Sequence, residues 1–203
     1  MAILMTGLCE KGVELIWKQC NEELYPQGIE YLEEAAHAGD AEGWFFLGNC
    51  YSWGDGAVGF SDKKAYECYK KGIEGGSVRC VLGAARAGQF DEELKKASPC
   101  TLEESYRAVL QSAEEGDAFS AFQIAAAYEW EAIFDLLQPE EQKRENCYKW
   151  YEQAAKGGIV SAMVKVGKCC LNGQYVPKNE EMALKWADRC AALGNAWGLY
   201  RMG

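Results

Sequence analysis

Small and apolar residues recur at intervals of three and four along most of the chain, in segments that end at glycine. The clearest segment is 40–76, where one such stripe starts at Ala41, a glycine-rich turn interrupts it, and a second stripe follows. This pattern predicts two short amphipathic helices that form an antiparallel hairpin. Ser61 or Asp62 is expected to cap the second helix, and Asn179 the matching helix of the last segment.

The glycine punctuation recurs about every 40 residues, and a small or apolar helix start follows it each time. One hairpin cannot bury its apolar face alone, so neighbouring hairpins must cover it. The period therefore predicts an all-α solenoid and a single repeat domain spanning residues 1–203. Its expected parts are a divergent first unit, four repeats and a partial capping helix, at 1–38, 40–76, 77–116, 117–158, 159–194 and 195–203.

Two of these units depart from the pattern. In 77–116 the first helix is short, and the second is predicted from Thr101 followed by Glu104, a capping box. In 117–158 an insertion replaces the glycine turn and carries an apolar cluster at residues 133–137. This cluster either folds back into the array or is offered to a partner.

Composition narrows the classes of partner. The chain has 203 residues, of which 49% are hydrophobic, enough to bury a core. Its formal net charge of −10 would repel nucleic acid and anionic membranes. No apolar run reaches the roughly 18 to 20 residues of a membrane span, and no secretory signal is seen, so a cytoplasmic location without membrane insertion is expected.

Ten cysteines are an even number, which would suit disulfides in an exported protein. Most fall on apolar helical stripes, where free thiols act as small packing residues. The neighbours Cys169 and Cys170 point about 100° apart on a helix, so either one thiol faces outward for redox chemistry or both simply pack. With His37 as the single histidine and no Cys-x-x-Cys pair, neither a metal site nor a cofactor is expected, and no catalytic set is visible.

Specific residues repeat together with the period. Residues 47–76 hold Leu-Gly, a tyrosine, Gly-x-Gly, Lys-Ala, a second tyrosine and a final glycine, and residues 166–191 repeat part of this order. The stretch 149–158, KWYEQAAKGG, is the most specific match. These residues resemble the Sel-1-like repeat, a relative of the tetratricopeptide repeat. The resemblance implies a right-handed α/α superhelix of about five helix pairs, whose first helices line a concave groove used as an adaptor surface for proteins.

Groove positions follow from the resemblance by matching the motif along each first helix. They are Glu42, Phe45, Asn49, Ser52, Trp53, Arg79, Leu82, Arg86, Phe119, Phe122, Glu129, Ser161, Val164 and Lys168. The leading hypothesis is a non-catalytic scaffold that holds a protein or peptide of unknown identity in this groove. The chain itself is expected to be a monomer or to associate weakly end to end.

Two alternatives stay open. One is an enzyme or small-ligand protein with a pocket near the irregular unit 77–116, where Arg79, Cys80 and Arg86 meet an anion. The other is an exported, disulfide-bonded interaction protein. A secreted subgroup of the resembled family pairs cysteines eight residues apart, but positions such as Ile73 and Val81 hold other residues here, which argues against that role and against β-lactam binding.

Overall fold

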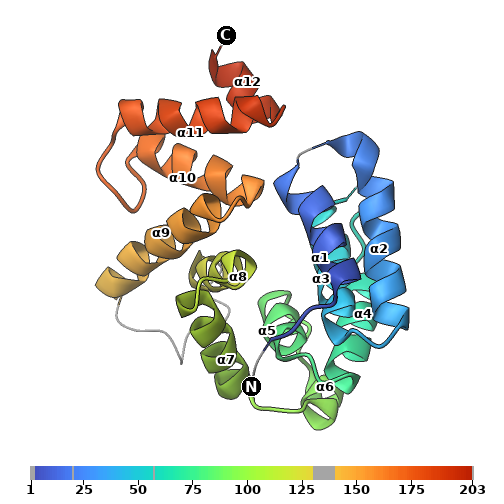
Figure 1. The fold of residues 1–203 in the computed structure, drawn as a ribbon. Helices are drawn as coiled ribbons and strands as arrows, with labels where there is room; N and C mark the ends of the chain where they lie inside the picture. Colours follow the sequence, from blue (N-terminus) through green and yellow to red (C-terminus); the bar gives the residue numbers. More distant parts are fainter. Residues whose placement is uncertain (1–2, 20, 57, 130–139, 203) are drawn as a thin grey trace. The chain divides into compact units, whose positions relative to one another are not determined.

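The computed structural model describes residues 3–19, 21–56, 58–129 and 140–202. In this described part all regular structure is helical, and it contains no strand (Figure 1). The predicted all-α class is confirmed. The predicted apolar cluster at residues 133–137 lies outside the described residues.

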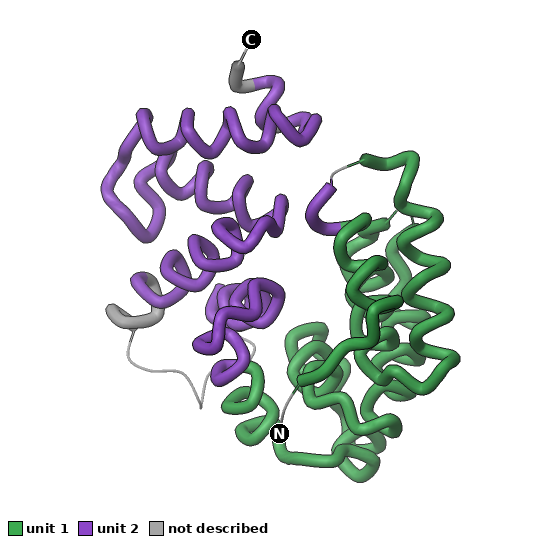
Figure 2. The backbone as a smooth tube through the Cα atoms, in the orientation of Figure 1, with its two compact units in different colours: residues 1–16, 21–109 green, residues 17–20, 110–203 purple. Residues whose placement is uncertain are grey.

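The chain divides into two compact units, coloured separately in Figure 2: residues 1–16 with 21–109, and residues 17–20 with 110–203. Unit 1 holds α1 (Gly7–Val13), most of the π-helical turn η1 (Glu14–Lys18), the 3-10 turn η2 (Glu22–Leu24), α2 (Tyr25–His37), α3 (Ala41–Trp53), α4 (Asp62–Glu74), α5 (Val78–Arg86), α6 (Glu92–Ala97) and the start of α7 (Leu102–Glu114). Unit 2 holds the rest of α7, α8 (Ala118–Glu129), α9 (Glu140–Lys156), α10 (Val160–Asn172), α11 (Glu180–Ala192) and α12 (Ala196–Met202). The expectation of one domain over the whole chain stays a prediction.

Helix starts predicted from the sequence are confirmed in their hydrogen bonds. Ser61 Oγ accepts from Lys64 N at 3.4 Å at the start of α4, and Asn179 caps α11 in the same way. At the start of α7, Thr101 Oγ1 accepts from Glu104 N at 3.2 Å, and Glu104 Oε2 accepts from Thr101 N at 2.8 Å. This is the reciprocal capping box. Local side-chain chemistry therefore sets where these helices begin.

The glycine punctuation corresponds to a helix-ending turn. Gly76 has φ of 90°, its N–H donates to Ile73 O at 2.9 Å, and the Ser77 N–H donates to Gly72 O at 2.8 Å. This pair of bonds is the Schellman closure, and the left-handed conformation it requires favours glycine. Ser77 then caps α5 by accepting from Cys80 N at 3.2 Å. The same two backbone bonds follow α2, α7 and α9, which explains the period.

Helices within unit 1 approach closely through small residues. A Cβ added at Gly43 of α3 would lie 2.7 Å from Ala36 N and 2.9 Å from Leu32 O of α2. A Cβ at Gly48 would lie 2.6 Å from Cε1 of Tyr69 in α4. The first helix of this repeat is therefore packed on two sides, with no room for a methyl group at either position.

Two elements do not follow the regular repeat pattern. Helix α1, in the divergent first unit, turns into η1 after Val13. Helix α6 was not predicted at all. It forms because Asp91 Oδ1 accepts from Glu93 N and Leu94 N, both at 3.0 Å, and because the Leu94 side chain is fully buried. A six-residue helix with one buried residue has no periodic pattern to detect.

Candidate functional site

Unit 1 carries a cluster of polar and aromatic side chains around the ends of α3 and α5. Ser52 and Trp53 follow Asn49 by three and four residues, so each lies on the same side as Asn49 in the last turns of α3. Arg86 is the last residue of α5, and Tyr69 lies in the middle of α4. These five residues are called the Arg86 cluster below.

Neutral oxygen atoms hold the guanidinium of Arg86. Its Nη2 donates to Ser52 Oγ at 3.1 Å and lies 3.5 Å from both Asn49 Oδ1 and Tyr69 OH. The guanidinium carbon lies 4.5 Å from the centroid of the Trp53 ring, a cation–π distance. Trp53 is 38% exposed and Arg86 is partly buried. A cation and an aromatic face are thus fixed beside each other at the surface of this unit.

Tyr69 is the most deeply buried residue of the cluster. It is fully buried, and its hydroxyl donates to Asn49 Oδ1 at 3.1 Å. Burial raises the pKa of Tyr69 to about 12, against the opposing effect of the Arg86 charge, so the hydroxyl stays protonated near neutral pH. Gly48 and Gly83 make room for the ring, because a Cβ at either would lie 2.6 or 3.0 Å from its Cε1.

Arg86 has no counter-charge within the described part of the chain. None of the ion pairs found there includes it. Only Nη2 of Arg86 bonds to atoms of the described residues. Nε and Nη1 form no such bond, and neither is a completely buried atom. The donor capacity of these two nitrogen atoms is therefore not used by the described residues.

Arg79 is a core residue, in contrast to Arg86. It is 1% exposed, and its Nε lies 3.7 Å from Glu42 Oε2. Its guanidinium carbon lies 5.7 Å and 5.8 Å from the ring centroids of Phe45 and Phe46. The carboxylate and the rings together accommodate a charge that is otherwise costly to bury.

The predicted anion site of Arg79, Cys80 and Arg86 does not assemble. Cys80 is fully buried, and burial raises its pKa well above the usual thiol value. Arg79 is turned toward Glu42 inside the core. Only Arg86 of the three is available to an anion in solution.

Several residues predicted to line the groove are core residues instead: Glu42, Phe45, Asn49, Arg79, Leu82, Phe119 and Phe122. The physical reason is that α3, α5 and α8 are buried over most of their surface, as α3 is by its contacts with α2, α4 and α5. In unit 2 every residue of α8 from Phe119 to Tyr128 is buried, and the Phe119 and Phe122 rings meet edge to face at 5.6 Å. The predicted positions that reach solvent are Ser52, Trp53, Arg86, Glu129, Ser161, Val164 and Lys168.

Glu129 of unit 2 is already engaged by its neighbours. It forms an ion pair with Lys165 of α10, and its Oε2 accepts from the Tyr151 hydroxyl at 2.6 Å. Ser161 and Lys168, four residues before and three residues after Lys165 on the same side of α10, are exposed.

Sequence reasoning missed the site roles of Tyr69, Tyr151 and Lys165. A usable signal existed for the tyrosines, since each lies seven residues before a helix-ending glycine, Gly76 or Gly158. Each also bonds to a polar residue near the end of the preceding first helix. Lys165 gave no such signal, because its partner is set by the packing of α10.

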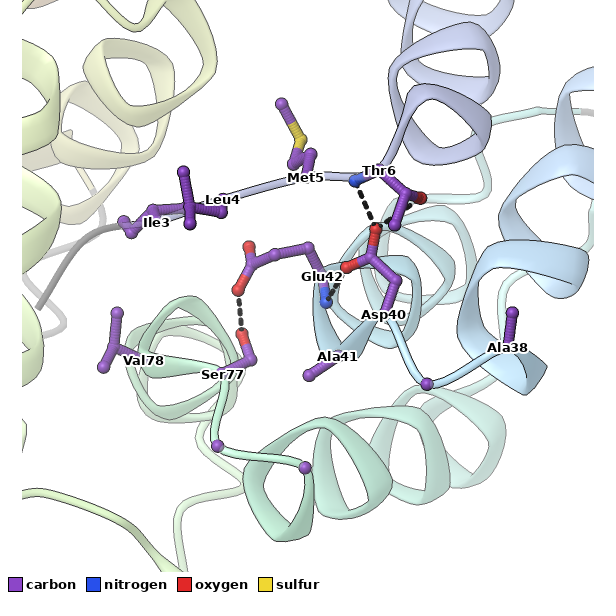
Figure 3. A pocket seen from close by; sticks show the side chains of 13 residues that line it. Ile3, Leu4, Met5, Thr6, Ala38, Asp40, Ala41, Glu42, Ser77 and Val78 are labelled. Carbon is purple, nitrogen blue, oxygen red and sulfur yellow. Dashed lines mark hydrogen bonds between the residues drawn. The ribbon is translucent and has the colours of Figure 1, made fainter.

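A cavity of about 460 Å³ lies in unit 1 beside the starts of α3 and α5 (Figure 3). The extended segment 3–6 forms one wall, and the turns before the two helices form the others. Thr6 N and Oγ1 both lie 2.7 Å from Asp40 Oδ2, and Ser77 Oγ donates to Glu42 Oε1 at 2.7 Å. The polar groups of the cavity thus bond to one another and hold the chain start in place. No sequence pattern had indicated this cavity.

The nine described cysteines form no disulfide, and eight of them are buried. Burial raises the pKa of Cys68 and Cys169 to about 11 and that of Cys147 to about 12. Cys169 and Cys170 are both buried, so the outward-facing thiol considered for redox chemistry is not found. Within the described residues no three acidic, cysteine or histidine side chains are placed to hold a metal ion.

Iodoacetamide is expected to modify Cys100 first among these nine thiols. Cys100 is the partly exposed one, and burial excludes the reagent from the others while disfavouring the reactive thiolate. Peptide mapping by mass spectrometry after brief exposure would measure the order of reaction. After unfolding in guanidinium chloride, all ten cysteines of the chain should react. A disulfide-linked pair in the unfolded sample would contradict this and favour the exported alternative.

None of the described helices combines the length and the apolar character needed to cross a bilayer.

A family model described as Sel1 repeat matches residues 23–40, 42–77, 137–159 and 160–195. A Sel1 repeat protein from Oxalobacter formigenes is similar in structure, with 21% identity and a TM-score of 0.45, over 87% of this chain and 48% of that one. A protective antigen of uropathogenic Escherichia coli with an SLR fold has 20% identity and a TM-score of 0.29, over 84% and 44%. The chain thus spans less than half of either structure.

The curated proteins compared with the chain include no match. The family model alone covers more than half of the chain, and its boundaries at 42–77 and 160–195 follow the α3–α4 and α10–α11 pairs. The chain belongs to the Sel1 repeat family.

Proposed function

We propose that the chain is a non-catalytic scaffold that binds a protein or peptide partner, and that the exposed part of the Arg86 cluster is one contact surface. Sel1 repeats generally serve as scaffolds for protein interactions. The observation that carries the proposal is the exposed Trp53 ring with the Arg86 guanidinium fixed 4.5 Å above it. Tryptophan and arginine are the residue types most enriched among energetic hot spots of protein interfaces.

A second contact surface is proposed on α10 of unit 2, at Ser161, Val164 and Lys168. These residues are three and four positions apart, so they share one side of the helix. Lys168 is exposed and suits an acidic group on the partner. A cytoplasmic location is also proposed, supported by the reduced form of the nine described cysteines, which suits a reducing compartment.

The test is affinity capture with immobilised protein from a lysate of the source organism, followed by mass spectrometry. Proteins captured by the wild type should be lost with Trp53→Ala and reduced with Arg86→Gln. Arg107→Gln, which changes a well-exposed arginine on α7, is the matched control and should keep them. Equal recovery of every captured protein by the wild type and by Trp53→Ala would overturn the assignment of this surface.

A further inference from the structure

The two units contain similar arrangements that differ in charge. Ser52 and Glu129 each lie 13 residues after a helix-ending glycine, so they are equivalent positions of two repeats, as are Tyr69 and Tyr151. In each unit a cation on the first helix of the next repeat bonds to the first of these two positions. Arg86 of α5 bonds to Ser52, and Lys165 of α10 bonds to Glu129. The two cations differ by about one helical turn in register.

The difference is that unit 2 supplies a carboxylate and unit 1 does not. Glu129 neutralises Lys165 and also accepts from Tyr151. In unit 1 the equivalent residue is Ser52, and the other acceptors of Arg86 are the neutral Asn49 and Tyr69. A partly buried cation with only neutral partners gains more from an incoming anion than a cation that is already paired.

The position of Arg86 is fixed before any ligand arrives. Three hydrogen-bond contacts restrain Nη2, and the Trp53 ring lies against the guanidinium carbon. Such restraint lowers the entropy lost when a ligand is bound. The remaining donors, Nε and Nη1, bond to no described residue and are not completely buried, which leaves their donor capacity for an acceptor from outside.

We infer that Arg86 is a binding site for one carboxylate of a protein partner, with Trp53 contacting the apolar group next to it. This rests on the proposed scaffold function and adds the chemistry of the contact. A single carboxylate fits better than a polyanion, because the net charge of −10 repels nucleic acid and anionic membranes. The carboxylate can belong to an aspartate or glutamate side chain or to a chain terminus.

The inference is tested by NMR titration of the full chain. The probes are N-acetylglutamic acid α-amide, which carries a side-chain carboxylate, and N-acetylglycine, which carries a terminal one. N-acetylglutamine α-amide is the neutral isostere, and inorganic phosphate is the competing anion. The readouts are the side-chain Nε–H signal of Arg86, assigned by its loss in Arg86→Lys, and the indole signal of Trp53, assigned by its loss in Trp53→Phe.

Saturable shifts of both signals are expected with one or both carboxylate probes, and no shift is expected with the neutral isostere. The probe that binds with the higher affinity shows whether the site prefers a side-chain or a terminal carboxylate. The apparent affinity read from Trp53 should fall by about tenfold or more in Arg86→Gln. Arg107, whose guanidinium is paired with Glu103, is the internal control and should shift much less. The inference fails if no carboxylate gives a saturable shift, if Arg107 responds equally, or if phosphate alone binds.

These outcomes are separable from the test of the scaffold. If captured proteins are lost with Trp53→Ala but no carboxylate shifts Arg86, the scaffold stands and the carboxylate site is wrong. If carboxylates shift Arg86 while both variants capture every protein normally, the site is real but does not serve this scaffold function. The wild-type titration carries the inference even if Arg86→Gln folds poorly.

Discussion

Arg79→Ala is expected to lower the free energy of unfolding by about 3–5 kcal/mol, because it removes the guanidinium that lies 3.7 Å from the buried Glu42 carboxylate. Glu42 is 6% exposed, and Ser77 Oγ donates to it at 2.7 Å. A neutral hydrogen bond of this kind offsets little of the cost of a buried charge. Removing the long side chain also opens space against Phe45 and Phe46.

Urea unfolding followed by far-UV circular dichroism would measure this loss. The control is the double variant Arg79→Met with Glu42→Gln, which removes both charges and keeps most of the volume. It should recover most of the stability, since replacing a buried pair by apolar or neutral groups is often close to neutral. A loss below about 1 kcal/mol in Arg79→Ala would mean that Glu42 is well solvated or protonated, against the burial described here.

Gly43→Ala should lower the free energy of unfolding by about 2 kcal/mol, although alanine normally favours a helix over glycine by about 1 kcal/mol. The added methyl would lie 2.7 Å from Ala36 N and 2.9 Å from Leu32 O. These are backbone atoms of α2, so no side-chain rotation can relieve the contact. Helices α2 and α3 must then separate and lose packing along their length.

Gly59→Ala is the matched control for this substitution. A Cβ at Gly59 meets nothing within 4 Å, and its φ is not in the left-handed region. Its effect on stability should stay within about 0.5 kcal/mol. Thermal unfolding of the two variants beside the wild type would make the comparison, and equal melting temperatures for all three would contradict the close approach of α2 and α3.

Helix starts and ends were predictable because their causes are local. The caps at Ser61, Thr101 and Asn179 depend on residues within three positions in sequence. The turn at Gly76 depends on a residue that tolerates positive φ. The repeat order, and with it the family, follows from these local signals recurring at one period.

Exposure along the first helices was not predictable in the same way. Motif matching placed Phe45 and Phe122 at the groove, yet both pack against other rings of their own units. A helix that is apolar all round has no pattern that separates inner from outer faces. Motif matching also placed Arg79 at the groove, and only the structure shows that it is buried with Glu42 opposite it.

The Arg86 site was predicted in part. Arg86, Ser52, Trp53 and Asn49 were all named from the motif, but as separate groove positions. Their convergence on one guanidinium depends on how the end of α3 meets the end of α5, which joins residues 34 positions apart. The absence of a counter-charge from the described residues is equally a property of the packed structure.

The turn between α4 and α5 also bears on how such a chain can grow. Its backbone bonds run from Gly76 and Ser77 back to α4, and Ser77 Oγ accepts from Cys80 N, so the signals that end one helix and start the next lie within a few residues of each other. Duplicating the stretch that ends here would create a new copy with the same stop and the same start signal. Lengthening by unequal recombination would therefore carry both signals with the duplicated stretch.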